Sequence, residues 1–514
     1  MKIKTLSLTD FRAFPGPAPA IFELDSKNLL VYGENGSGKS SLFYALRGLF
    51  TVGKPPELLG LRNSFSAQGI GTVAVRVDFD DASHASWHVG ASVLQVVGSP
   101  AAQGPSAVAL HPTQMQPPNA SVAEAAKFSA LLDYRSLLNT NYKHGDGPIN
   151  LFELAVHGFL ADYRDLATNK SIKELWQAVL DGKPQRNTSK TLAICVGRCA
   201  AFNNAIQKAL GLLKVEAQQI LATLSPHGLA LVDLTFTPVA FNYAKAWADK
   251  NFVNQFVGLE VAFKGQSVDR PQLYLNEARQ SALGLALYLG ARLACAPQTT
   301  PHLKLLVLDD VLIGLDHSNR LPLLKLLESR FVDWQIVLLT HDKSWFDLAR
   351  HHLTTTTWAC CEIYEGDPAA SAPMPVIRKT ENRPAKALLA KGRQLLALGY
   401  VEAAANYTRQ AFEYGLRGGC EFQKVKLSYK VDSKDHQAQD LLDALKIASK
   451  PTSVSQADWS SCLQKIELFK NVVMNPYSHP SAPNIPRQEV VDAADAVDTF
   501  LTLAGKNSAL SRSH

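Results

Sequence analysis

A phosphate-binding loop is predicted near the start of the chain. Residues 33–40 follow the pattern GxxxxGK[ST] with Gly33, Glu34, Asn35, Gly36, Ser37, Gly38, Lys39 and Ser40, after the apolar run 29–32. The glycines allow backbone N–H groups to turn toward phosphate oxygens, and the helix expected from Lys39 to Phe50 adds positive potential. Lys39 would contact the β- and γ-phosphates and Ser40 would be a ligand of Mg²⁺, with Ser41 beside them.

Two carboxylates follow an apolar segment much later in the chain. Residues 303–309, LKLLVLD, predict a buried strand that ends at Asp309 and is followed by Asp310. We expect Asp309 to hold Mg²⁺, directly or through water, and Asp310 to act as general base toward an attacking water. Together with the phosphate loop, this pair predicts that ATP is hydrolysed as well as bound.

A second polar site is predicted one strand further on. Residues 335–340, QIVLLT, predict another buried strand, and His341 follows it. A histidine there can hydrogen-bond the γ-phosphate or the attacking water, with a purely structural histidine as the alternative. Between the two strands, the segment GLDHSNR places Asp316 close to the predicted nucleotide site.

The elements that would position these groups alternate between strands and helices. Alternation predicts strands over 2–8 and within 20–32, and an antiparallel meander over 73–97 before a surface loop at 98–120. Residues 121–225 are predicted to be mostly helical, with one long helix from about Ser189 to Leu224. Strands are predicted over 228–264, and helices over 275–296 and 318–330. The expected class is α/β, with a short helical arm inserted at about 121–225.

Composition limits the remaining function classes. The 514 residues are 46% hydrophobic and 19% charged, which excludes wholesale disorder, and the net charge of +6 permits a nucleic-acid partner without requiring one. No run of about 18 apolar residues predicts a membrane span, and the N-terminal residues lack a signal-peptide pattern. The seven cysteines include no CxxC pair, so we expect a cytoplasmic protein without disulfides or zinc.

A domain boundary is predicted where proline, alanine and glycine cluster. We expect a head over residues 1–365, a linker over 366–385 and an all-helical C-terminal domain over 386–514. The final 132 residues hold 17 Lys and Arg against 13 Asp and Glu, so most of the basic excess lies there.

The strings GENGSGKS, LVLDDV, GLDHSNR and LLTHD, in that order, resemble the ABC-type ATPase heads of the RecF, SMC and Rad50 class. The resemblance implies a cytoplasmic ATPase that uses ATP and Mg²⁺. It further implies that Arg12 in DFRAF lies near the nucleotide, and that Gln68 senses the Mg²⁺ ion, with an ordinary surface glutamine as the alternative. In this class a signature segment from one subunit covers the ATP of another. The segment LNEARQ supplies Asn276, Glu277, Ala278 and Arg279 at that place and predicts a head-to-head dimer or a larger even oligomer.

The strings LNEARQSALGLAL and LDDVLIGLDHSNRLPLL look most like the small ATPases of bacterial anti-phage defence, of the Septu type and its retron-linked forms. That likeness implies an ATP-driven switch that controls an effector nuclease encoded nearby. Two alternatives stay open: a RecF-like DNA repair ATPase, and an ATP-gated ribonuclease.

The C-terminal region resembles a HEPN-type helical domain, with a predicted hairpin that turns at Gly399. HEPN ribonucleases carry Arg-x(4–6)-His near the end, whereas this chain has Met474 in the arginine position before His479. We therefore expect a docking or assembly module, in which Asn475 and His479 are candidate contacts to RNA or a protein partner.

Overall fold

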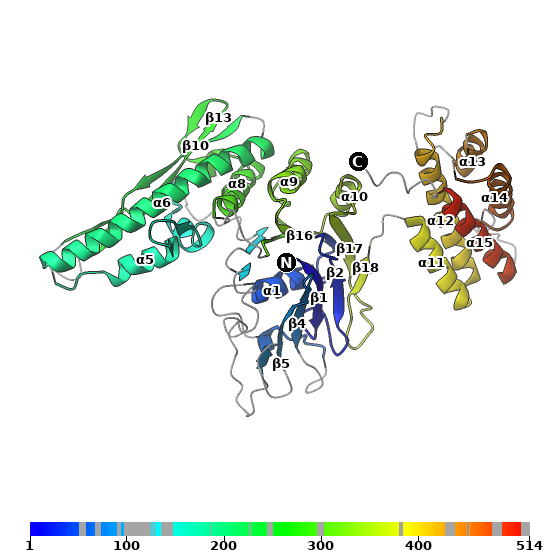
Figure 1. Cartoon of the computed structure of the whole chain (residues 1–514), viewed down its shortest axis with the longest axis horizontal. Coiled ribbons are helices and arrows are strands. Elements are labelled where there is room, and N and C mark those ends of the chain that lie inside the picture. Colours follow the sequence, from blue (N-terminus) through cyan, green and yellow to red (C-terminus); the bar gives the residue numbers. More distant parts are fainter. Residues whose placement is uncertain are drawn as a thin grey trace. The chain divides into compact units, whose positions relative to one another are not determined.

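The computed structural model describes two compact units, Met1–Lys379 and Thr380–His514 (Figure 1). The described residues are 1–50, 58–66, 73–89, 94–96, 125–126, 129–134, 147–186, 188–225, 228–243, 250–295, 303–379, 384–426, 437–448, 450–451, 453–474 and 486–504. Each unit has its own hydrophobic core.

A mostly parallel sheet forms the centre of the first unit. Its described strands run in the order β18 (Val376–Lys379), β17 (Trp358–Tyr364), β3 (Asn28–Gly33), β16 (Gln335–Thr340), β15 (Leu305–Asp309) and β7 (Ala130–Asp133), and only β18 is antiparallel to its neighbour. Because side chains alternate along a strand, Leu306 and Leu308 enter one core while Leu305 and Val307 enter the other. Burial on both faces explains why these strands appear in the sequence as continuous apolar runs.

An antiparallel sheet covers one face of this layer. It runs in the order β2 (Ala20–Glu23), β1 (Ile3–Thr9), β4 (Ala74–Phe79), β5 (His84–Val89) and β6 (Leu94–Val96), which confirms the predicted meander. Helix α1 (Lys39–Leu49) buries Leu42 and Leu46 in the core that both sheets share. Gln335 joins the sheets, because its side-chain amide accepts from the backbone N–H of Ile3 at 2.6 Å and donates to its carbonyl oxygen at 2.8 Å.

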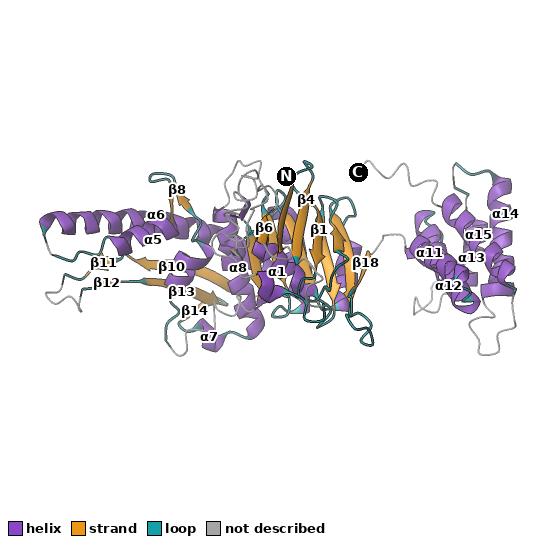
Figure 2. Cartoon of the chain, turned by 90° about the horizontal axis from the view of Figure 1, so that it is seen from below, coloured by secondary structure: helices purple, strands orange, loops and turns teal. Residues whose placement is uncertain are grey.

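Helices cover the opposite face, and an arm extends from them to one side (Figures 1 and 2). Helices α8 (Glu277–Cys295), α9 (His317–Arg330) and α10 (Lys343–His352) pack there. The arm is formed by α5 (Ile172–Asp181), the 36-residue α6 (Ser189–Leu224) and a sheet of β10 (Leu229–Thr237), β13 (Phe256–Phe263) and β14 (Gln266–Val268). At 1.5 Å per residue α6 is about 54 Å long, and it packs along α8.

Short elements complete the first unit. They are the 3₁₀ turn η1 (Leu58–Leu61), α4 (Phe152–Leu154), the π-helical turn η4 (Ala155–Phe159), β8 (Arg164–Asp165), β9 (Lys170–Ser171), β11 (Ala240–Phe241), β12 (Phe252–Val253) and α7 (Pro271–Tyr274).

The predicted class, an α/β head with a meander and an inserted arm, followed by a helical region, is confirmed. Two local expectations were wrong. Residues 130–133 lie in the segment expected to be helical but form β7, because pairing with β15 outweighs the weak signal of a four-residue strand. Residues 376–379 lie in the expected linker but form β18 on the edge of β17. The predicted surface loop at 98–120 lies outside the described residues.

The second unit contains only helices among its described residues. They are α11 (Pro384–Ala397), α12 (Val401–Phe422), α13 (Ala438–Ile447), α14 (Gln456–Phe469), the π-helical turn η7 (Lys470–Met474) and α15 (Arg487–Ala504). The predicted turn between α11 and α12 is confirmed at Gly399, whose φ of 87° a residue with a side chain rarely adopts. Met474 is buried in the core at 1% exposure, and Lys470 is also buried and donates to Gln439. Both positions therefore serve packing.

None of the helices in the described part of the chain combines the length and the apolar character that crossing a membrane needs.

Candidate functional site

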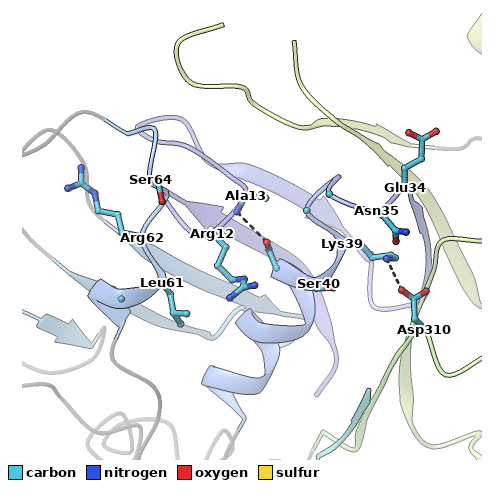
Figure 3. Close-up of a pocket in the computed structure, with 14 residues that line it drawn as sticks. Arg12, Ala13, Glu34, Asn35, Lys39, Ser40, Leu61, Arg62, Ser64 and Asp310 are labelled. Carbon is cyan, nitrogen blue, oxygen red and sulfur yellow. Dashed lines mark hydrogen bonds and ion pairs between the residues drawn. The ribbon is translucent and has the colours of Figure 1, made fainter. Parts of the chain in front are cut away.

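The phosphate loop joins β3 to α1 in the predicted way. Gly36 and Gly38 have φ values of 90° and 99°, a left-handed backbone that turns the loop around and that glycine adopts without strain. Helix α1 begins at Lys39, so its first N–H groups face the loop. Beside the loop lies a pocket of about 460 Å³ (Figure 3), lined by Arg12, Ala13, Glu34, Asn35, Gly36, Gly38, Lys39, Ser40, Ser41, Gly60, Leu61, Arg62, Ser64 and Asp310. Gly33 and Ser37 complete the loop without lining the pocket.

Three predicted residues from distant parts of the sequence meet at this loop. The Lys39 ammonium nitrogen lies 2.9 Å from one carboxylate oxygen of Asp310 (Figure 3). The other oxygen accepts from the backbone N–H of His341 at 3.0 Å and lies 3.0 Å from its ring Nδ1. Asp310 has a φ of 54°, so the chain turns sharply after β15 and directs this carboxylate toward the phosphate loop. In this state Lys39 is paired with Asp310, and entering phosphates would compete for it.

Asp309 lies at the end of β15 and is only 8% exposed. Burial and the neighbouring charge of Asp310 raise the pKa of Asp309 to about 6, against the lowering effects of Lys39 and Ser40. Its buried oxygen Oδ1 has no hydrogen-bond partner among the described residues. A buried carboxylate oxygen without a partner, near a serine hydroxyl, fits a Mg²⁺ ligand set, because hard oxygen donors and negative charge are what this ion prefers. Asp309 and Ser40 are the residues that would hold the ion.

Arg12 lies at the opposite wall of the pocket. Its guanidinium carbon is 4.0 Å from the centre of the Tyr44 ring, and its buried Nε has no partner among the described residues. The backbone N–H of Arg12 donates to Leu61 at 2.7 Å, and Asn63 donates to the Arg12 carbonyl at 2.6 Å. A planar cation fixed in this way can contact a phosphate or stack on a base.

Sequence reasoning missed the segment 60–64 in the pocket. Arg62 reaches it through an ion pair with Asp10, at 2.7 Å from a carboxylate that is fully buried. Asp10 and Arg62 are 52 positions apart and belong to no short pattern, so only an alignment of covarying positions could have indicated the pair.

A partly buried ion pair joins α9 to the residue that follows His341. Arg320, 9% exposed in α9, donates to the Asp342 carboxylate at 2.5 Å and to the carbonyl oxygen of Leu315 at 3.3 Å. Asp342 follows His341 directly and caps α10 by accepting from the N–H of Trp345 at 2.9 Å. Desolvation opposes a fall in the pKa of Asp342, but hydrogen bonds from Trp345 and Arg320 lower it. Arg320 thus fixes the backbone that carries His341.

The other predicted residues lie away from this pocket. The signature segment forms the start of α8, where the Asn276 side chain accepts from the N–H of Arg279 at 3.1 Å. Arg279 stacks on Phe263 at 4.5 Å, and Glu277 accepts from Tyr134 at 2.7 Å. Asp316 is exposed at the start of α9. Neither Asp316 nor residues 276–279, Ala278 included, line the pocket of their own chain, so their predicted nucleotide contacts stay predictions. Gln68, Asn475 and His479 lie outside the described residues.

Comparison with known proteins adds a family match. Residues 5–90, which include the phosphate loop, match the family model described as an AAA domain. A search of curated protein sequences gave no match. Among solved structures, the Smc head domain of Pyrococcus furiosus with ScpA is 14% identical, with a TM-score of 0.43 over 76% of this chain and 99% of that one. The SMC head domain from Thermotoga maritima is 13% identical, with a TM-score of 0.37 over 74% of this chain and 100% of that one. ATP-bound RecF is 16% identical, with a TM-score of 0.43 over 74% of this chain and 98% of that one.

Proposed function

We propose that this chain binds and hydrolyses Mg²⁺-ATP at the pocket beside the phosphate loop. The observation that carries the proposal is the meeting of Lys39, Asp310 and His341, from three separate segments, at a glycine loop of the correct sequence. The unpartnered Asp309 oxygen beside them supports a divalent ion. Titration with a fluorescent ATP analogue tests this: we expect saturable binding that Mg²⁺ strengthens, and binding without any effect of Mg²⁺ would contradict the role of Asp309.

The chemistry expected of each residue follows from its contacts. Lys39 is positioned to neutralise phosphate charge, which releases one Asp310 oxygen to accept a hydrogen from an attacking water. A carboxylate only accepts, so His341 Nδ1 carries a hydrogen toward Asp310, and Nε2 is left for the water or the γ-phosphate. Mg²⁺, when bound, would neutralise charge that develops on the phosphates. Asp310 is shorter than a glutamate by one methylene, so we expect slow turnover.

The active state is proposed to be a head-to-head dimer. Asn276 and Arg279 lie at an exposed helix start outside the pocket of their own chain, so they are available to the nucleotide of a second copy. The stacking of Arg279 on Phe263 holds its cation in place before a partner arrives.

Mixing two inactive variants tests the dimer. Lys39→Ala spoils the phosphate loop and Asn276→Asp spoils the signature, so a mixed dimer should regain one intact site of two. Up to about half of the wild-type rate per mixed dimer is expected. Light scattering that shows a strict monomer at all ATP concentrations, or mixtures without recovery, would contradict the composite site.

We propose that the ATPase acts as a switch subunit in a bacterial anti-phage defence complex and controls an effector nuclease. The similarity of two sequence strings to such ATPases supports this role. A nuclease gene beside this gene, and co-purification of its product with the full chain, are the expected results. Recruitment to gapped DNA without such a partner would favour the alternative RecF-like repair role.

The second unit is proposed to be a docking or assembly module and not a ribonuclease. Burial of Met474 and Lys470 supports this, because neither side chain can reach a scissile phosphate. Incubation of the purified protein with tRNA, with and without ATP, should give no cleavage. Cleavage that His479→Ala abolishes would favour the ATP-gated ribonuclease.

A further inference from the structure

A hollow of about 450 Å³ at the far end of the arm carries an excess of positive charge. It lies where α5 turns into α6 (Figures 1 and 2). The residues that line it include three cations, Lys183, Arg186 and Arg198, and one carboxylate, Asp181. The exposed Lys190, in the first turn of α6, adds a fourth cation next to it.

Arg198 is built into this hollow by its contacts. A Cβ at Gly182 would lie 2.8 Å from the Arg198 Cδ, so the glycine leaves room for the arginine in this position. One guanidinium nitrogen donates to the carbonyl oxygen of Ala178 at 2.9 Å, near the end of α5. Because a guanidinium has five N–H donors, most of them stay available to a ligand.

A buried lysine holds the loop between α5 and α6, which carries Lys183 and Arg186. Lys250 is only 6% exposed and donates to the carbonyl oxygen of Gln185 at 3.4 Å. The start of α6 is already capped, since Thr188 accepts from the N–H of Thr191 at 3.2 Å. The attraction for an anion therefore comes from the side chains and not from free helix amides.

The charges at the arm's end differ from those along its length. Beside the middle of α6, Lys214 pairs with Asp233 at 2.9 Å and Lys208 lies 3.4 Å from Asp165. Among the described residues, Arg186, Lys190 and Arg198 form no ion pair. The lining carboxylate, Asp181, accepts from Gln177 at 2.8 Å. Unneutralised cations that repel one another reduce stability, and a bound anion would remove that repulsion.

We propose that this hollow binds phosphate groups, either of a nucleic-acid backbone or of a free polyphosphate. Arginine forks and lysines are the usual partners of phosphate oxygens. At about 30 Å³ per water, the hollow has the volume of about fifteen waters, which is more than a single phosphate group needs. The exposed Ile194 in its wall offers apolar contact to a base. This site is separate from the ATP pocket and does not depend on the proposed hydrolysis.

The test uses the full chain and a charge-matched control. Arg186→Glu/Lys190→Glu reverses two exposed cations at the hollow, and Lys170→Glu/Lys173→Glu reverses two exposed cations at the other end of α5. Fluorescence anisotropy with labelled single-stranded and duplex oligonucleotides should show at least about tenfold weaker binding for the first variant only. Its duplex log–log salt slope should fall by about 1.8, at about 0.9 per lost phosphate contact. The ATP hydrolysis rate without nucleic acid should be unchanged in both.

A second binding experiment distinguishes the source of the phosphate. With Lys39→Ala added to all three proteins, tripolyphosphate can no longer use the phosphate loop. Tripolyphosphate binding that only the hollow variant loses, without oligonucleotide binding, supports the site with a free polyphosphate as its ligand. Equal affinities of hollow variant and control, no binding of either probe, or binding of polyglutamate alone would overturn the proposal.

Discussion

Replacing Asp309 by asparagine should stabilise the free protein while removing its response to Mg²⁺. The folded protein holds Asp309 at a pKa of about 6 against an ordinary value of 3.8, because burial and Asp310 disfavour its charge. A difference of roughly two units corresponds to about 3 kcal/mol, at 1.36 kcal/mol per unit. An asparagine keeps the shape and carries no charge, so most of that cost should disappear.

The sign of this effect fixes its pH dependence. A carboxyl group with a raised pKa in the folded state makes unfolding easier as pH rises from 3.8 to about 6, and the cost is complete above that. Asp309→Asn should therefore be about 2–3 kcal/mol more stable than wild type at pH 7.5, and close to wild type at pH 4.

Chemical denaturation of the nucleotide-free protein in EDTA, followed by circular dichroism, measures both values. Asp310→Asn is the matched control. It relieves the charge beside Asp309 but also removes the partner of Lys39 and His341, so it should gain less stability than Asp309→Asn. In the presence of Mg²⁺, wild type should become more stable than Asp309→Asn, because only the wild-type carboxylate can bind the ion. An Asp309→Asn protein that is less stable than wild type at pH 7.5 without Mg²⁺ would refute the reasoning.

Three further predictions follow from the same contacts. Asp310→Asn should still bind Mg²⁺-ATP but hydrolyse it about 10²–10⁴-fold more slowly in single-turnover assays, and a wild-type rate would mean that another residue orients the water. The apparent affinity for Mg²⁺, measured by calorimetry, should be about tenfold weaker at pH 5 than at pH 7.5, because the Asp309 proton must leave first; a constant affinity would contradict that ligand. Arg320→Ala should lower the free energy of unfolding by about 2–3 kcal/mol, since it leaves Asp342 partly buried and unpaired, whereas Lys325→Ala on the exposed side of α9 should have little effect.

Local patterns in the sequence predicted which residues gather at the phosphate loop, and periodicity predicted the fold. The phosphate loop, the acid pair and His341 each follow an apolar strand, and parallel strands bring such ends to one edge of a sheet. That geometry is why residues 270 and more positions apart could be expected to meet, as Lys39 and Asp310 do.

What the sequence did not predict depends on pairing over long distances. Arg62 reaches the pocket only because Asp10 is buried 52 positions earlier, and Arg320 meets Asp342 across two elements. Strands β7 and β18 have four residues each and are set by a neighbouring strand rather than by their own propensity. The hollow at the end of the arm combines α5, its following loop and α6, so no single motif marks it.

Phosphate release at saturating Mg²⁺-ATP, compared between wild type and Lys39→Ala, tests the central claim most directly. Lys379→Ala is the control, because Lys379 and its exposed partner Glu23 do not line the pocket. Wild type and Lys379→Ala should release phosphate at equal rates, and Lys39→Ala should show no turnover above background. A folded Lys39→Ala protein that hydrolyses ATP at the wild-type rate would contradict the assignment of this pocket as the ATPase site.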